Sequence, residues 1–122
     1  MKSVKISDAE WHVMNVLWSR SPLTGGEIIA ALEAKSAWRP RTIRTLLDRL
    51  VGKGAVKVLS EGKRRFVPEV SLGDCVRSES RSFIERAFGG RPASMLLHII
   101  KDAKLTKQEI DQLKKLLSEK QK

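Results

Sequence analysis

The sequence is poor in the residues from which several classes of protein are built. It contains one cysteine, Cys75, so neither an intramolecular disulfide nor a cysteine-based metal site can form. It contains no tyrosine and few other aromatic residues, which argues against a single-strand binder built on stacked aromatic side chains. No apolar run approaches the length of a membrane span, and residues 1–6 lack the apolar core of a signal peptide. We therefore expect a cytoplasmic protein that does not insert into a membrane.

Patterns that carry catalysis or bind metals are also missing. The two histidines, His12 and His98, have no third ligand at metal spacing, so each is interpreted as a surface or packing residue. The sequence shows no nucleophile–base pair, no glycine-rich phosphate loop and no carboxylate dyad. We therefore expect neither an enzyme nor a resident metal or cofactor.

Positive charge, in contrast, is concentrated in one segment. Lysine and arginine number 24 against 14 acidic residues, which gives a formal net charge of +10. Between Arg39 and Arg65 there are nine basic and two acidic residues, which leaves +7 in that segment. A charge excess in so short a stretch is typical of a protein that binds a polyanion.

Residues 40–54 predict a short helix at the centre of this basic segment. Its buried stripe would consist of four apolar residues at helical spacing, Ile43, Leu46, Leu47 and Leu50. Pro40 suits a first helical turn and Gly54 suits a helix end. The opposite face would show arginines and threonines, which can contact base edges and phosphates in a DNA groove. Taken alone, the pattern also fits an ordinary amphipathic helix with a solvated basic face.

Two further helices are predicted before the basic one. Ser7 and Glu10 form a capping box that opens a helix to about Arg20, and Thr24 and Glu27 form a second capping box. Three tryptophans are interpreted as part of the core of this region, namely Trp11, Trp18 and Trp38. Three short helices, of which the third is basic, form the skeleton of a helix-turn-helix unit.

A β-hairpin is predicted directly after the basic helix. The β-prone segments are 55–60 and 64–70, and Glu61-Gly62-Lys63 is the turn between them. The cations near its tip, Lys63, Arg64 and Arg65, make it the wing of a winged helix, since such tips commonly rest on the phosphate backbone. A lone hairpin could equally be a solvated surface feature, but helix and wing in this order favour DNA binding.

Three apolar helices are predicted in the last third of the chain, over about 71–88, 93–103 and from 107 onward. The residues expected to form a dimer interface are Phe83, Phe88, Leu96, Ile100, Ile110, Leu113, Leu116 and Leu117. Helices this short and apolar cannot easily bury themselves, so pairing with a second copy is expected. A two-fold protein would also match a two-fold operator. The alternative is that these helices pack back on the winged helix as one monomeric domain.

The predicted fold is therefore mainly α with a small β-hairpin wing. A winged helix-turn-helix domain over residues 1–70 would precede a three-helix dimerisation domain over residues 71–122. Two functions fit this fold. The first is a dimeric, sequence-specific DNA-binding repressor. The second is a basic RNA- or ribosome-associated module, because winged helices are used there too and a fold does not fix a function.

Two strings, ISDAEWHVMNVLW at 6–18 and WRPRTIRTLLDRL at 38–50, are specific enough to carry a family resemblance. They resemble the penicillinase-repressor family (BlaI/MecI/CopY type). The resemblance implies a winged-helix N-terminal domain, a helical dimerisation domain and repression at palindromic operators, typically with TACA/TGTA-type half-sites. Copper-responsive relatives carry a C-terminal cysteine cluster that this sequence lacks, so direct metal sensing is not expected.

The resemblance also implies roles for single residues. The base-reading positions would be Arg41, Thr42 and Thr45, although the family often has lysine at the position of Arg41. The DNA backbone contacts implied by the family are Arg49, Lys53, Lys63, Arg64 and Arg65. Arg44, on the flank of the same helix, is assigned to the backbone as well.

A route of release is implied by the same resemblance. Family members tied to β-lactam sensing, and so to antibiotic resistance, are cut by a membrane sensor metalloprotease, typically at an Asn-Phe bond. The matching bond here is His98-Ile99, and both residues depart from that pattern. Loss of the chain beyond this bond would remove Ile110 and the leucines of the last helix from the dimer and weaken operator binding by mass action.

Overall fold

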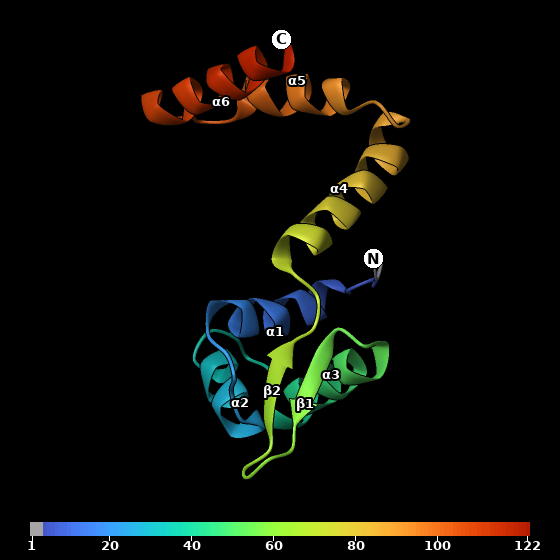
Figure 1. The fold of residues 1–122 in the computed structure, drawn as a ribbon, viewed down its shortest axis with the longest axis vertical. Coiled ribbons are helices and arrows are strands. Elements are labelled where there is room, and N and C mark those ends of the chain that lie inside the picture. The colour runs from blue at the N-terminus through green and yellow to red at the C-terminus, as the bar shows by residue number, and fades with distance from the viewer. Residues whose placement is uncertain (1–3) are drawn as a thin grey trace. The chain divides into compact units, whose positions relative to one another are not determined.

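The computed structural model describes residues 4–122 and shows, in that range, six helices and one two-stranded antiparallel sheet (Figure 1). In chain order the elements are α1 (Asp8–Ser19), α2 (Gly25–Glu33), α3 (Pro40–Lys53), β1 (Val56–Leu59), β2 (Arg65–Pro68), α4 (Leu72–Phe88), α5 (Pro92–Asp102) and α6 (Lys107–Lys120). The predicted class, mainly helical with a hairpin wing, is confirmed. Residues 1–3 lie outside the described residues, and with them the start of the expected first domain and of the stretch interpreted as lacking a signal-peptide core.

The chain divides into two compact units, the first ending at Ser82 and the second beginning at Phe83. The division falls inside α4, because the first turns of this helix belong to the first unit. Cys75 in α4 is buried among the core residues of that unit. The domain boundary predicted at residues 70 and 71 stays a prediction.

Side-chain caps define the starts of three helices. In α1 the Glu10 amide donates to Ser7 Oγ at 3.2 Å, and the Ser7 amide donates to Glu10 Oε1 at 2.9 Å. The same reciprocal pair is formed by Thr24 with Glu27 at α2, and by Thr106 with Glu109 at α6. Each box satisfies two backbone N–H groups that the helix itself leaves without a partner, so these predicted starts are confirmed.

The first unit has one hydrophobic core between its three helices and the hairpin. α1 packs against α2, α3 and β2, while α3 also packs against β1. The largest fully buried apolar side chains are Met14, Leu17, Ile28, Ile43 and Leu50. The three tryptophans interpreted as core residues are only partly buried and pack around its edge. The Trp18 indole shows why, since its Nε1–H needs a partner and donates to the Val70 carbonyl at 2.9 Å.

The hairpin pairs β1 with β2 so that Val58 lies opposite Phe66. Both strands are shorter than predicted, and Gly62 in the connecting turn has a positive φ of 70°, which glycine adopts without steric cost. An isolated bridge, which the sequence pattern did not predict, joins a third segment to β2. Leu23 and Phe66 exchange two backbone hydrogen bonds, of 3.2 and 2.7 Å. The start of the α2 segment is thereby fixed to the wing.

The second unit leaves most of its apolar residues exposed. α4 ends at Phe88, and Gly89 and Gly90 follow with positive φ angles of 57° and 82°. The Phe88 ring lies 5.8 Å from the Phe83 ring and 6.0 Å from the His98 ring, measured between centroids. Neither α5 nor α6 contains a buried residue.

Between residues 4 and 122, no helix combines the length and the apolar character that a membrane span requires.

Candidate nucleic-acid interface

Helix α3 separates its apolar and polar residues onto opposite faces. Its four leucine and isoleucine residues are at most 5% exposed, so the apolar face of the helix packs into the core. All six charged and hydroxyl residues that follow Pro40 as far as residue 49 are exposed: Arg41, Thr42, Arg44, Thr45, Asp48 and Arg49. Pro40 opens the helix, and Gly54, in a left-handed conformation with φ 82°, ends it. The three predicted base-reading residues therefore lie together on the exposed face of the first two turns.

The hydroxyl of Thr45 is already used inside the helix. Its Oγ1 donates to the Arg41 carbonyl at 3.0 Å, one turn back. Because a hydroxyl has one proton, Thr45 is left with its methyl group and with oxygen lone pairs that can accept. The side chain is thereby held in a fixed orientation and can contact a thymine methyl or accept a hydrogen bond, but it does not donate one in this state.

The wing brings two of its three predicted cations next to α3. Lys63 and Arg64 are exposed and line one groove together with Arg44 and Asp48 of α3 and with residues at the start of α2. The Arg64 guanidinium carbon lies 5.2 Å from the centre of the Phe66 ring, a cation–π distance. Phe66 is buried in the core and paired with Leu23, so the ring that Arg64 contacts is part of the packed first unit. Arg65 is half-buried within β2 and does not line this groove, and neither does Arg49.

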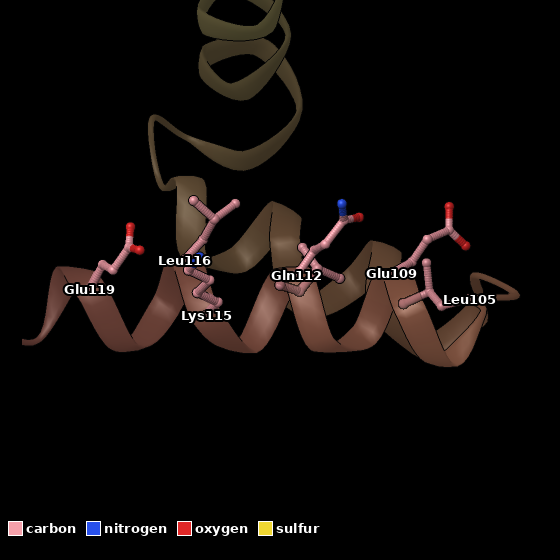
Figure 2. A pocket seen from close by; sticks show the side chains of 7 residues that line it. Leu105, Glu109, Gln112, Lys115, Leu116 and Glu119 are labelled. Atoms are coloured by element: carbon pink, nitrogen blue, oxygen red, sulfur yellow. The ribbon is translucent and has the colours of Figure 1, made fainter.

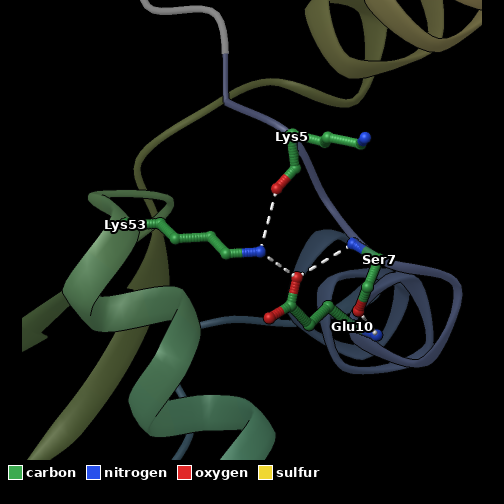
Figure 3. Close-up of polar contacts among 4 residues, drawn as sticks. All are labelled: Lys5, Ser7, Glu10 and Lys53. Carbon is green, nitrogen blue, oxygen red and sulfur yellow. Dashed lines mark hydrogen bonds and ion pairs between the residues drawn. The ribbon is translucent and has the colours of Figure 1, made fainter.

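Lys53 has a contact that the sequence did not predict. Its Nζ forms an ion pair with Glu10 and donates to the Lys5 carbonyl at 2.9 Å (Figure 3). The same Glu10 oxygen, Oε1, also accepts from the Ser7 amide (Figure 3). This bonding joins the last turn of α3 to the start of α1. The predicted phosphate contact of Lys53 would have to compete with these partners.

Glu10 is the buried charge of this cluster, with only 1% of its surface exposed. Burial by itself raises the pKa of the carboxyl. The hydrogen bond and the positive charge of Lys53, together with the hydrogen bonds of Ser7, outweigh this effect of burial. The pKa of Glu10 is therefore lowered below its ordinary value. The sequence pattern identified Glu10 only as a helix cap. Its second role had no local signal, because Lys53 lies 43 residues away.

Six of the eight residues predicted for dimerisation are exposed apolar side chains of the second unit. Exposed fractions are 43% for Phe83, 46% for Leu96, 43% for Ile100, 39% for Ile110, 60% for Leu116 and 54% for Leu117. Phe88 and Leu113 are half-buried. Leu113 and Leu116 line a groove on α6. Glu109, Gln112 and Glu119 also line it and lie along the same side of the helix (Figure 2). The bond between His98 and Ile99 lies within α5, and both residues are exposed.

The two histidines and the cysteine take part in packing contacts. The His12 ring meets the Trp38 ring edge-on at 5.1 Å, and His98 contacts Phe88 as described above. Cys75 is buried, and this burial, with the nearby Asp74 carboxylate, raises the pKa of its thiol away from the reactive thiolate form. Within residues 4–122, no group of three or more histidine, cysteine or acidic side chains could hold a metal ion.

Comparison with known proteins gives consistent matches over almost the whole chain. Residues 6–119 match the family model described as penicillinase repressor. The chain is 39% identical over 122 residues to the penicillinase repressor of Bacillus licheniformis, covering 98% of this chain and 94% of that protein. It is 32% identical over 120 residues to the methicillin resistance regulatory protein MecI of Staphylococcus aureus (strain N315), covering 98% of each.

Solved structures agree with this match. The solution structure of the Bacillus licheniformis BlaI monomeric form in complex with the blaP half-operator is similar at a TM-score of 0.55 and 41% identity, covering 61% of this chain and 93% of that one. MepR, a transcription regulator of the Staphylococcus aureus multidrug efflux pump MepA, is similar at a TM-score of 0.51 over 94% of this chain and 77% of that one. At 18% identity the second likeness shows the fold alone.

Proposed function

The chain belongs to the penicillinase-repressor family of DNA-binding transcriptional repressors, and from this premise we propose that it acts as a homodimer on a palindromic operator. It is a regulator rather than an enzyme. The family assignment also decides against the RNA- or ribosome-associated alternative. We place its action in the cytoplasm, where the operator DNA would be.

The observation that carries the proposal is the exposed face of α3 beside the wing. Arg41, Thr42 and Thr45 would read base edges in the major groove, because they lie on the first two turns of an exposed helix face. Arg44, Lys63 and Arg64 line a groove next to that face and would hold the flanking phosphates. Arg49 and Arg65 would add further backbone contacts at the edges of this surface. Among relatives of solved structure, the BlaI monomer is in complex with a half-operator, which supports the same use here.

Homodimerisation through the second unit is the next part of the proposal. α5 and α6 are amphipathic but bury none of their apolar residues within one chain, and a second copy would cover them. A dimer would present two copies of α3, one for each half of a two-fold operator. Binding both half-sites at once would raise the affinity through effective concentration, without any new contact.

The proposal is tested with three nucleic acids of equal length. A palindromic operator duplex, the same duplex with one half-site scrambled, and a structured RNA are titrated with the full chain at physiological salt. Sedimentation at the same protein concentrations gives the number of copies bound. We expect one dimer on the palindrome, weaker binding to the single half-site and the weakest binding to RNA. Equal affinity for all three would contradict sequence-specific repression.

Release of repression is proposed to follow loss of the C-terminal part. Cutting at His98-Ile99 would remove α6 and the last four residues of α5 from the dimer. Because the bond lies inside a helix, a protease such as a membrane sensor metalloprotease would need local opening of α5 first. A chain truncated after His98 should sediment as a monomer and lose operator affinity at physiological salt. If the truncated chain binds as tightly as the full chain, release works by another route.

A further inference from the structure

We propose that Asp48 determines the base preference at one position of each half-site, by accepting a hydrogen bond from the exocyclic amino group of a cytosine. This inference rests on the proposed function, since it names a base contact of the same α3 surface. Asp48 is the only acidic residue of α3, and it lies on the exposed face of the helix.

The position of Asp48 on the helix is that of a base reader. At 3.6 residues per turn, its side chain points within about 20° of Arg41 and about 60° of Thr45 around the helix axis. Along the axis it lies about 4.5 Å beyond Thr45, which corresponds to between one and two base steps of B-DNA. A helix that inserts Arg41 and Thr45 into the major groove therefore directs Asp48 at a base pair adjoining the one they contact.

The carboxylate of Asp48 has no hydrogen-bonding or ion-pair partner in the part of the chain that the structure describes. Among residues 4–122, the Asp48 carboxylate accepts no hydrogen bond and forms no ion pair, whereas Glu10 pairs with Lys53 and Asp74 pairs with Arg77. It lines a groove with Arg44, Lys63 and Arg64, yet none of these cations lies within ion-pair distance of it. A free carboxylate on a surface that approaches phosphates is repelled by them, so its presence costs affinity unless the DNA offers it a donor.

The hydrogen-bonding groups of the α3 surface indicate which DNA base would donate to the Asp48 carboxylate. Arginine side chains only donate, so Arg41, Arg44 and Arg49 match the acceptors of guanine or phosphate. In the major groove only cytosine N4 and adenine N6 carry donors, and adenine presents its N7 acceptor beside N6. A carboxylate, which only accepts, is therefore matched to cytosine. Among the charged side chains of α3, Asp48 alone cannot pair with guanine.

The test is a base-preference profile of the full chain, obtained by repeated selection from duplexes with randomised half-sites. Wild type is compared with Asp48→Ala and Asp48→Asn. Because the Asp48 side chain is exposed and has no polar partner among residues 4–122, neither change removes a hydrogen bond or an ion pair. The matched control is Glu61→Gln in the wing turn, which also removes one exposed negative charge near the proposed DNA surface.

We expect Asp48→Ala to lose about tenfold in the preference for cytosine at one position per half-site, while all other positions keep their profile. Its affinity for random DNA should rise. Asp48→Asn should shift the same position from cytosine towards adenine, since a carboxamide can donate to N7 and accept from N6. Glu61→Gln should raise the affinity for all duplexes together and leave the profile unchanged.

An Asp48→Ala profile identical to that of wild type, with all affinities raised as in Glu61→Gln, would overturn the inference and leave Asp48 as a general repulsive charge. In that case the proposed function would stand, because wild type still selects an operator. If wild type selects no sequence at all, the proposed function fails, and this inference fails with it.

Discussion

The two units of the chain bury their apolar residues to very different extents. In the described range every buried apolar residue lies at or before Cys75, in the first unit, whereas α5 and α6 have none. Both units use the same means of starting a helix, so local structure does not explain the difference. What differs is whether a helix finds a covering surface within its own chain. The first unit buries its apolar residues within the chain, and the second leaves an apolar surface that a second copy would cover in the proposed dimer.

The largest effect on the difference between the two units is expected from placing charged residues in the apolar stripe of α6. Replacing Leu113 and Leu116 by aspartate should produce monomers and lower the affinity for a full operator by about 100-fold or more, because the gain from binding two half-sites is lost. The midpoint of thermal unfolding of the first unit should not change. Sedimentation and fluorescence anisotropy on a palindromic duplex measure the two effects.

The control for that prediction places two aspartates at exposed, neutral positions on the opposite side of α6, as Gln108→Asp with Ser118→Asp, so that the net charge changes by the same amount. This variant should remain dimeric. A Leu113, Leu116 double variant that stays dimeric, or that binds the full operator as wild type does, would show that the second unit is not the interface.

The next largest effect is expected from the buried ion pair of the first unit. Lys53→Met leaves the Glu10 carboxylate buried with only its Ser7 contacts and should lower the free energy of unfolding by about 2–3 kcal/mol. The sedimentation of the folded protein should stay that of wild type. Lys57→Met in β1 is the matched control, because that exposed lysine has no partner among the described residues, and it should change stability little.

The pH dependence of unfolding separates this role of Lys53 from a phosphate contact. The pKa of Glu10 is lower in the folded than in the unfolded state, so its contribution is fully present above the unfolded pKa, about 4.3, and is lost as pH falls through the folded pKa. Lys53→Met should reduce this acid-side loss. A variant with unchanged stability and a salt slope lower by about one would instead identify Lys53 as a phosphate contact.

A base-reading residue should affect DNA choice and leave both stability and assembly unchanged. Arg41→Ala should cost roughly 1–3 kcal/mol of operator affinity and flatten the preference at one base pair per half-site. Titration of operator and random duplexes at one salt concentration measures the effect. An equal loss on both duplexes would make Arg41 a backbone contact.

The smallest effect is expected on the wing. Arg64→Ala should weaken operator and random DNA about equally, by about 1 kcal/mol, and lower the salt slope by about one. Arg81→Ala, which removes the same charge from an exposed position on α4, should leave the salt slope unchanged. An unchanged slope for Arg64→Ala would exclude it from the phosphate contacts.

Much of the fold follows from local sequence signals. Capping boxes such as Ser7 with Glu10 fix helix starts within four residues, and the leucine spacing of α3 determines which face is buried. The same periodicity identified Arg41, Thr42 and Thr45 as exposed. These features depend on interactions between near neighbours, so a single sequence contains them.

Interactions between distant residues could not be predicted in this way. The bridge between Leu23 and Phe66 is a single pair and has no strand-like run around Leu23. The bond from Trp18 to the Val70 carbonyl and the pairing of Lys53 with Glu10 join residues more than 40 positions apart. The family resemblance assigned Lys53 to the DNA backbone, whereas the packing of α3 against α1 places its side chain next to Glu10.

The exposed apolar surface of α5 and α6 also has a consequence for gene dosage. If only the paired form binds the whole operator, its concentration varies with the square of the chain concentration when most chains are unpaired. Halving the cellular amount of the chain would then lower operator-bound protein about fourfold at low occupancy. A regulated gene would respond to a modest drop in protein synthesis or to partial degradation, before the last chains were gone.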